Sequence, residues 1–78
     1  MREQTMRLVV AFHTTAEAMA TEQLCHAQGL PGRLISAPRA LGADCGIAWC
    51  APPETEEALT RALSAAGVDT AGFHTLPL

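Results

Sequence analysis

Three cysteines are the residues of this sequence best suited to chemistry, because a thiolate is both a nucleophile and a metal ligand. They are Cys25, Cys45 and Cys50. An odd number of cysteines fits reduced thiols in the cytoplasm better than the paired framework of a secreted domain. Cys45 and Cys50 are an odd number of residues apart, so an extended strand directs them to opposite faces of a sheet. A disulfide between these two would therefore require the strand to rearrange.

Cys45 is the strongest candidate because it stands where a loop is expected to give way to a strand. Gly46 follows it and removes side-chain obstruction on one side. Arg33 and Arg39 are candidate cationic neighbours, because a hairpin of the flanking strands is expected to bring both near this loop. Positive charge nearby favours the thiolate, whereas the carboxylate of the adjacent Asp44 opposes it. The alternative is that Cys45 is a small strand-end residue without chemistry.

The other two cysteines favour structural roles. Cys50 is expected to pack in the core or at an interface, and Cys25 to be an exposed, inert thiol beside the apolar stripe of a helix. His13 ends the first predicted strand. If that strand ran parallel to the third, His13 and Cys45 would lie at opposite ends of the sheet, which argues against a Cys–His pair. Trp49 is expected to pack in the core or to anchor an interface.

Neither a metal nor another cofactor is expected. Cysteine and histidine supply enough ligand types for zinc, but the sequence lacks the close Cys-x2-Cys or His-x3-His spacing that marks such sites. No glycine-rich phosphate loop or paired-carboxylate arrangement is present either.

Composition narrows the class of protein. The chain has 78 residues, a formal net charge of -3 and five arginines that form no basic stripe, which argues against nucleic-acid binding. Its longest strongly apolar run, Leu8–Phe12, is too short to cross a membrane, and no signal region follows Met1. We expect a flexible leader over residues 1–5, a single domain over residues 6–78 and a cytoplasmic location.

Hydrophobic periodicity predicts a β-α-β-β-α-β order. Strands are expected over residues 8–13, 33–36, 45–50 and 71–76, with helices after the capping box Thr14–Glu17 and after Pro52. This order is typical of a ferredoxin-like α+β sandwich, in which two helices cover one face of a four-stranded antiparallel sheet. The expected buried stripes of the helices are Ala16, Met19, Ala20, Leu24 and Ala27 in the first, and Leu59, Ala62, Leu63 and Ala66 in the second.

The uncovered sheet face predicts self-association. The first strand is apolar on both sides, and isolated domains rarely leave wide apolar patches bare. A second subunit is the expected cover, so we expect a homo-oligomer.

Three segments together carry a resemblance to a known family. They are Phe12–Ala20, Leu30–Ile35 and Asp44–Trp49, the last containing Cys-Gly-Ile-Ala-Trp. On these segments the chain resembles the family of putative selenium/sulfur carrier-like proteins. The resemblance implies a carrier, rather than a true enzyme, that holds a persulfide or selenosulfide on Cys45. It also implies a donor such as a cysteine desulfurase and an acceptor enzyme as protein partners.

Two other classes of function stay open. One is a structural or regulatory module that pairs through its uncovered sheet face. The other is a redox sensor, in which peroxide would reversibly oxidise Cys25 or Cys45.

Overall fold

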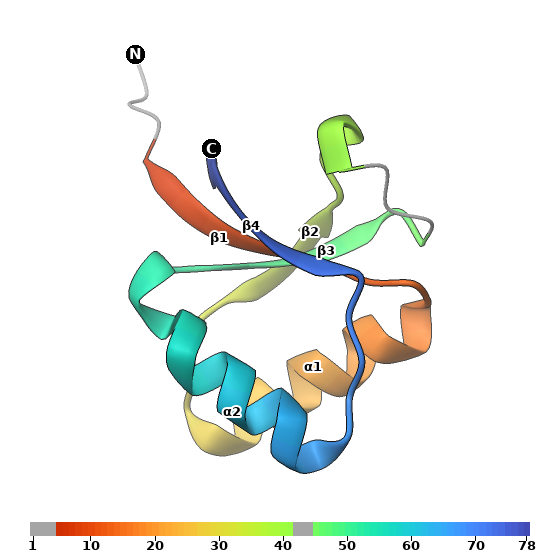
Figure 1. Cartoon of the computed structure of the whole chain (residues 1–78), viewed down its shortest axis with the longest axis vertical. Helices are drawn as coiled ribbons and strands as arrows, with labels where there is room; N and C mark the ends of the chain where they lie inside the picture. Colours follow the sequence, from red (N-terminus) through yellow and green to blue (C-terminus); the bar gives the residue numbers. More distant parts are fainter. Residues whose placement is uncertain (1–4, 42–44) are drawn as a thin grey trace.

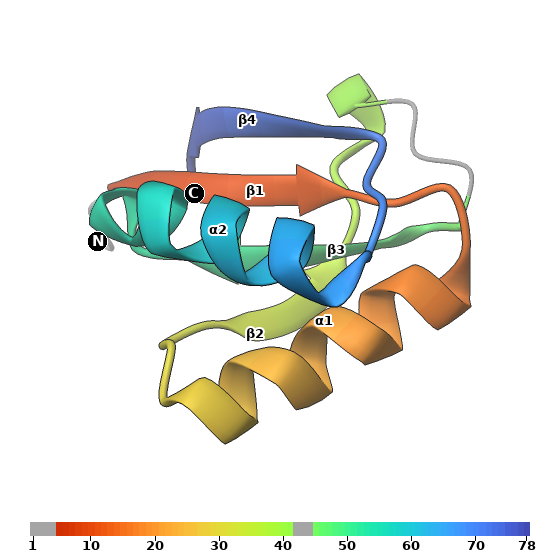
Figure 2. The same ribbon diagram turned by 60° about the horizontal axis from the view of Figure 1, so that its bottom comes forward.

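The computed structural model describes residues 5–41 and 45–78, and it confirms the predicted βαββαβ order. The sheet has the strand order β2-β3-β1-β4, and every adjacent pair is antiparallel. Both helices lie on the same side of it (Figures 1 and 2). The fold is therefore an α+β, ferredoxin-like sandwich. Its elements are β1 (Met6–Ala11), α1 (Thr15–Gln28), β2 (Arg33–Ser36), β3 (Ile47–Ala51), α2 (Glu56–Ala66) and β4 (Gly72–Pro77), with single 3-10 turns at Arg39–Leu41 and Pro53–Thr55.

The predicted antiparallel sheet is confirmed, and the parallel pairing of β1 with β3 that was used to place His13 far from Cys45 is wrong. These strands are antiparallel, with Leu8 opposite Ala51 and Ala11 opposite Ala48. The error lay in treating them as parallel: α1 returns the chain so that β2 runs parallel to β1, and the hairpin then reverses β3. The last residues of β1 and the first residues of β3 consequently lie next to each other, at the same end of the sheet.

Trp49 forms the centre of the core between the sheet and the helices. It is fully buried, and on the helix-covered face it lies between Leu34 of β2 and Val10 of β1. Its ring presses on Gly32, where an added Cβ would lie 2.5 Å from a ring carbon. This close approach explains why the turn before β2 contains glycine, and it confirms core packing for Trp49.

Local signals fix both ends of α1. Thr14 accepts a hydrogen bond from the Glu17 amide at 3.1 Å, and the Glu17 carboxylate accepts one from the Thr14 amide, as in the predicted capping box. Gly29 ends the helix in the left-handed conformation, with φ 68°.

The buried stripe of α1 differs from the prediction. Ala18, Thr21 and Cys25 face the core, while Met19 is 53% exposed. The sequence misleads here because alanine dominates the helix and a threonine is buried. The Thr21 hydroxyl donates to the Glu17 carbonyl at 2.9 Å, so burial leaves it no unmet hydrogen bond. In α2 the buried residues Leu59, Ala62 and Leu63 agree with the prediction, although Ala66 is exposed.

The sheet face opposite the helices is better covered than expected. Val9, Ala11 and Ala48 are buried within the single chain. The His74 side chain lies over Gly72, close to Ala11 in the register, and contributes to this cover. A second subunit on this face stays a prediction. In the described part of the chain, neither helix combines the length and the apolar composition needed to cross a bilayer.

The expected leader lies outside the described residues, with one exception. Thr5 exchanges backbone hydrogen bonds with Leu78 at 3.0 and 3.1 Å. This pair extends the β1–β4 ladder by one residue, at the end of the strands that follows the Met6–Pro77 pair.

Candidate functional site

Strand β3 carries a cysteine at each of its two ends. Cys45 lies in the turn just before Ile47, the first residue of β3, and Cys50 is next to its last residue. The expected strand start at Cys45 was two residues early, because Gly46 has a φ of 73° that no strand adopts. Cys45 packs against the helix-side core, whereas Cys50 faces a pocket on the other side of the sheet. The prediction that the two thiols point to opposite faces is confirmed.

Cys45 is half-buried, and its thiol is only lightly held. The Sγ atom donates a hydrogen bond to the Ile47 carbonyl at 3.2 Å. Gly46 beside it is exposed, and a Cβ added there would meet no atom of the described residues within 4 Å. Such a thiol has one side against the core and one side open. This S–H···O contact is weak, so little hydrogen bonding holds the thiol in this orientation.

The two arginines expected near Cys45 are in different places. Arg39 is exposed in the 3-10 turn of the β2–β3 connection that also contains Cys45. Arg33 lies directly opposite Cys50, at the far end of the hairpin, so its expected position was wrong. It begins β2, and only the last residue of that strand, Ser36, pairs beside the loop. The expected opposing effect of Asp44 lies outside the described residues.

His13 lies at the same end of the sheet as Cys45, although the two residues were expected at opposite ends. Its Nδ1 lies 3.3 Å from the Glu17 carboxylate, and its backbone amide donates to the same group at 2.7 Å. Desolvation acts to raise the pKa of Glu17, but the hydrogen bonds from His13 and Thr14 and the charge of His13 lower it on balance. The Glu17 carboxylate thus stabilises the turn between β1 and α1 at this end of the sheet.

Cys25 is fully buried rather than exposed, which corrects its expected position. The rotation of α1 that leaves Met19 in solvent directs Cys25 into the core. Burial raises the pKa of the Cys25 thiol, so this group stays protonated and unreactive at neutral pH. Its role is packing. Among the described residues, no group of three or more histidine, cysteine or acidic side chains could hold a metal ion.

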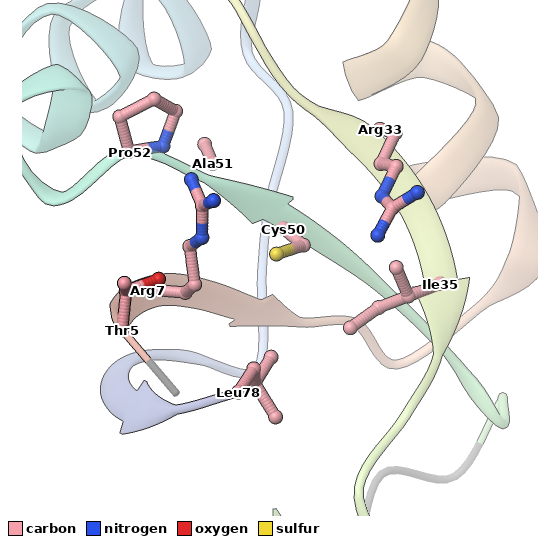
Figure 3. Close-up of a pocket in the computed structure, with 8 residues that line it drawn as sticks. All are labelled: Thr5, Arg7, Arg33, Ile35, Cys50, Ala51, Pro52 and Leu78. Carbon is pink, nitrogen blue, oxygen red and sulfur yellow. The ribbon is translucent and has the colours of Figure 1, made fainter. Parts of the chain in front are cut away.

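A pocket around Cys50 is the feature that sequence reasoning missed. It has a volume of about 620 Å³ and lies on the sheet face away from the helices (Figure 3). Strand alternation alone does not place Arg7 and Arg33 beside Cys50, because this also requires the registers of β1 and β2 against β3. Its lining residues are Thr5, Arg7, Arg33, Ile35, Cys50, Ala51, Pro52 and Leu78.

The comparisons with known proteins identify the class of protein. The family described as "Putative Se/S carrier protein-like" matches residues 7–75. This match spans all six helices and strands of the sandwich except the ends of β1 and β4. The chain belongs to this family. Comparison with curated proteins and with solved structures found no match.

Proposed function

We propose that this protein holds sulfur or selenium on Cys45 and passes it to a partner protein. Family membership over residues 7–75 supports the carrier class. The position of Cys45 is the observation that carries the assignment to this residue. Of the three cysteines, it is the one outside a helix or strand and the one that is more than marginally exposed.

The transfer step needs a reachable sulfur and no added oxidant. The Cys45 thiolate attacks the outer sulfur of a donor persulfide, and a new S–S bond forms as the donor S–S bond breaks. The products are a Cys45 persulfide and a donor thiolate, so charge and electrons balance. An acceptor nucleophile then attacks the outer sulfur and regenerates the Cys45 thiolate. Selenium in the outer position follows the same course.

The half-buried setting of Cys45 suits a carrier. The side of the thiol that packs on the core shields the inner sulfur, while the outer atom of a persulfide projects past Gly46 towards solvent. We propose that Arg39, in the same connection, supplies positive charge to the bound chalcogen. The position of Arg33 opposite Cys50 gives it no such role. A cysteine-desulfurase-like donor and a selenium- or sulfur-using acceptor are the proposed partners.

Loading by a desulfurase tests this proposal. The protein is incubated with a cysteine desulfurase and cysteine, repurified without reductant, and weighed by intact mass spectrometry. We expect a gain of about 32 Da, one sulfur atom, that dithiothreitol removes. Cys45→Ala should lose the adduct, and the matched variant Cys50→Ala should retain it. An adduct that persists in Cys45→Ala, or that forms in no variant, would contradict the proposal.

A further inference from the structure

The pocket around Cys50 brings together positive charge from two strands. Arg33 of β2 lies directly opposite Cys50, and Val9 of β1 lies opposite it on the other side. Arg7 precedes Val9 by two residues, so it shares the same face and is a diagonal neighbour of Cys50. Figure 3 shows Cys50 between the Arg7 and Arg33 side chains. The thiol thus forms the floor of a gap with a guanidinium on each side.

Among residues 5–41 and 45–78, no aspartate or glutamate lines this pocket. Within residues 5–41 and 45–78, the ion pairs are His13–Glu17 and Arg61–Glu57, and neither involves Arg7 or Arg33. The pocket is therefore locally positive on a chain whose formal net charge is -3. Arg7 and Arg33 are exposed and have no carboxylate partner among the described residues, so each is available to an anion, which it can bind through two parallel N–H donors.

The walls of the pocket distinguish an organic anion from an inorganic one. Its volume of about 620 Å³ lies in the range of small-molecule sites. Besides the arginines, Ile35, Ala51, Pro52 and Leu78 contribute hydrocarbon side chains to the lining. A sulfate-sized ion would satisfy one guanidinium and leave this surface unfilled. A short carbon chain with an acidic group at each end would cover the hydrocarbon and reach both arginines.

We infer that this pocket binds a small organic anion with two acidic groups, one held by Arg7 and the other by Arg33. The Cys50 side chain is 8% exposed, and the pocket is where that exposed part lies. The bound anion would sit above the sulfur and shield it. This site is separate from the proposed chalcogen site in position, face and charge, so either can be absent without the other.

Titration with succinate, followed by backbone amide NMR, tests the site. Succinate is the probe for a short dianion, succinamide is its uncharged analogue, and sulfate is the inorganic ion. We expect saturable shifts confined to the amides around Arg7, Arg33 and Cys50 with succinate, weaker ones with sulfate and none with succinamide. Arg7→Gln and Arg33→Gln should each weaken succinate binding about tenfold, as expected for losing one charge-assisted contact.

Arg61→Gln is the matched control, because Arg61 lies on α2 outside the pocket. It should leave succinate binding unchanged. All three arginines are exposed, so their replacement should not unfold the domain. Absence of saturable shifts with succinate would overturn the inference, as would equal binding in Arg7→Gln, Arg33→Gln and Arg61→Gln. Sulfate binding as tight as succinate binding would overturn the assignment to an organic anion. None of these results depends on sulfur loading at Cys45.

Discussion

The two ends of β3 hold the same reactive group in different settings. At one end, Cys45 lies in a turn beside Gly46, half-buried, with its thiol held by one contact to the Ile47 carbonyl. At the other end, Cys50 lies within the paired strand, 8% exposed, with Arg33 opposite and Arg7 diagonal to it. Cys45 is the more accessible of the two thiols, and Cys50 is the one with two arginines beside it.

This difference separates two kinds of site that a cysteine can serve. Exchange of a sulfur atom between proteins requires the attacking thiolate to meet the donor sulfur directly, so access is indispensable. Binding of a small anion requires fixed positive charge and a shaped wall, and the thiol can stay covered. The Cys45 end satisfies the first requirement, and the Cys50 end satisfies the second. The predictions below test this separation in order of decreasing effect.

Alkylation rates should separate the three cysteines most strongly. In native protein with iodoacetamide, Cys45 should react fastest, Cys50 more slowly, and Cys25 on the order of a hundredfold or more below Cys45, because a core thiol reacts only through unfolding. Residue-resolved mass spectrometry over time gives each rate. Cys25 reacting as fast as Cys45 would show that the core is open and would remove the basis of the comparison.

The buried Cys25 thiol also makes stability sensitive to alkaline pH. Because its pKa is raised in the folded state, its contribution to the free energy of unfolding is complete below the ordinary thiol pKa of about 8.5. It is lost as pH rises through the higher folded value. Urea unfolding of wild type and Cys25→Ala from pH 7 to 10 should show the difference between them change only in the alkaline range. A difference that is constant with pH would contradict this prediction.

Two glycines should respond unequally to alanine, one near each end of β3. Gly32→Ala drives a Cβ into the Trp49 ring, so we expect a loss of about 1–3 kcal/mol in the free energy of unfolding. Gly46→Ala meets no other described atom, so we expect only the strain of its positive φ, about 1 kcal/mol. Urea denaturation measures both. A larger loss for Gly46→Ala would show that the turn beside Cys45 is more tightly packed than described.

The contribution of Glu17 to the free energy of unfolding should be lost in acid. Its lowered pKa means that ionised Glu17 stabilises the fold above the ordinary glutamate pKa of about 4.3, and that this contribution is lost as pH falls through the lower folded value. The stability difference between wild type and Glu17→Gln should therefore shrink from pH 6 to pH 3. Glu22→Gln, in the same helix but without these hydrogen bonds, is the control. A stability difference between wild type and Glu17→Gln that does not vary with pH would contradict stabilisation of the turn by the ionised carboxylate.

The smallest expected effect is a charge preference in alkylation. The ratio of the rate with anionic iodoacetate to the rate with neutral iodoacetamide should be a few-fold higher at Cys50 than at Cys45, because two arginines flank Cys50. Added sodium chloride should reduce this preference by screening. The ratio of the two adducts at each residue, measured by mass spectrometry with and without salt, checks it. Equal ratios at the two cysteines would argue against a positive pocket.

Features that depend on neighbouring residues in the chain were predictable from the sequence. The capping box at Thr14, the glycine stop at Gly29 and the βαββαβ order all follow from such local patterns. The antiparallel sheet follows from that order, whereas His13 was placed at the wrong end of the sheet because its position was argued from a parallel pairing of β1 with β3. Cys25 was misplaced because an alanine-rich helix has little amphipathic pattern to show its orientation.

The site was predictable only in part, for the same reason. The loop before Cys45 and the Gly46 beside it follow from the local sequence, although the strand begins two residues later than predicted. The neighbourhood of Cys50 requires the register of three strands, since Arg7, Cys50 and Arg33 are far apart in the chain. Reading Arg33 as a neighbour of Cys45 was an error of register, not of residue type.

Direct location of the transferred atom in the wild-type protein is the most decisive measurement. After loading by a desulfurase, free thiols and persulfides are capped with iodoacetamide, and the peptide that contains both Cys45 and Cys50 is fragmented. We predict the extra sulfur on fragments that contain Cys45 alone, with Cys50 carrying none. Extra sulfur on Cys50 with an unmodified Cys45 would contradict the division of roles between the two ends of β3.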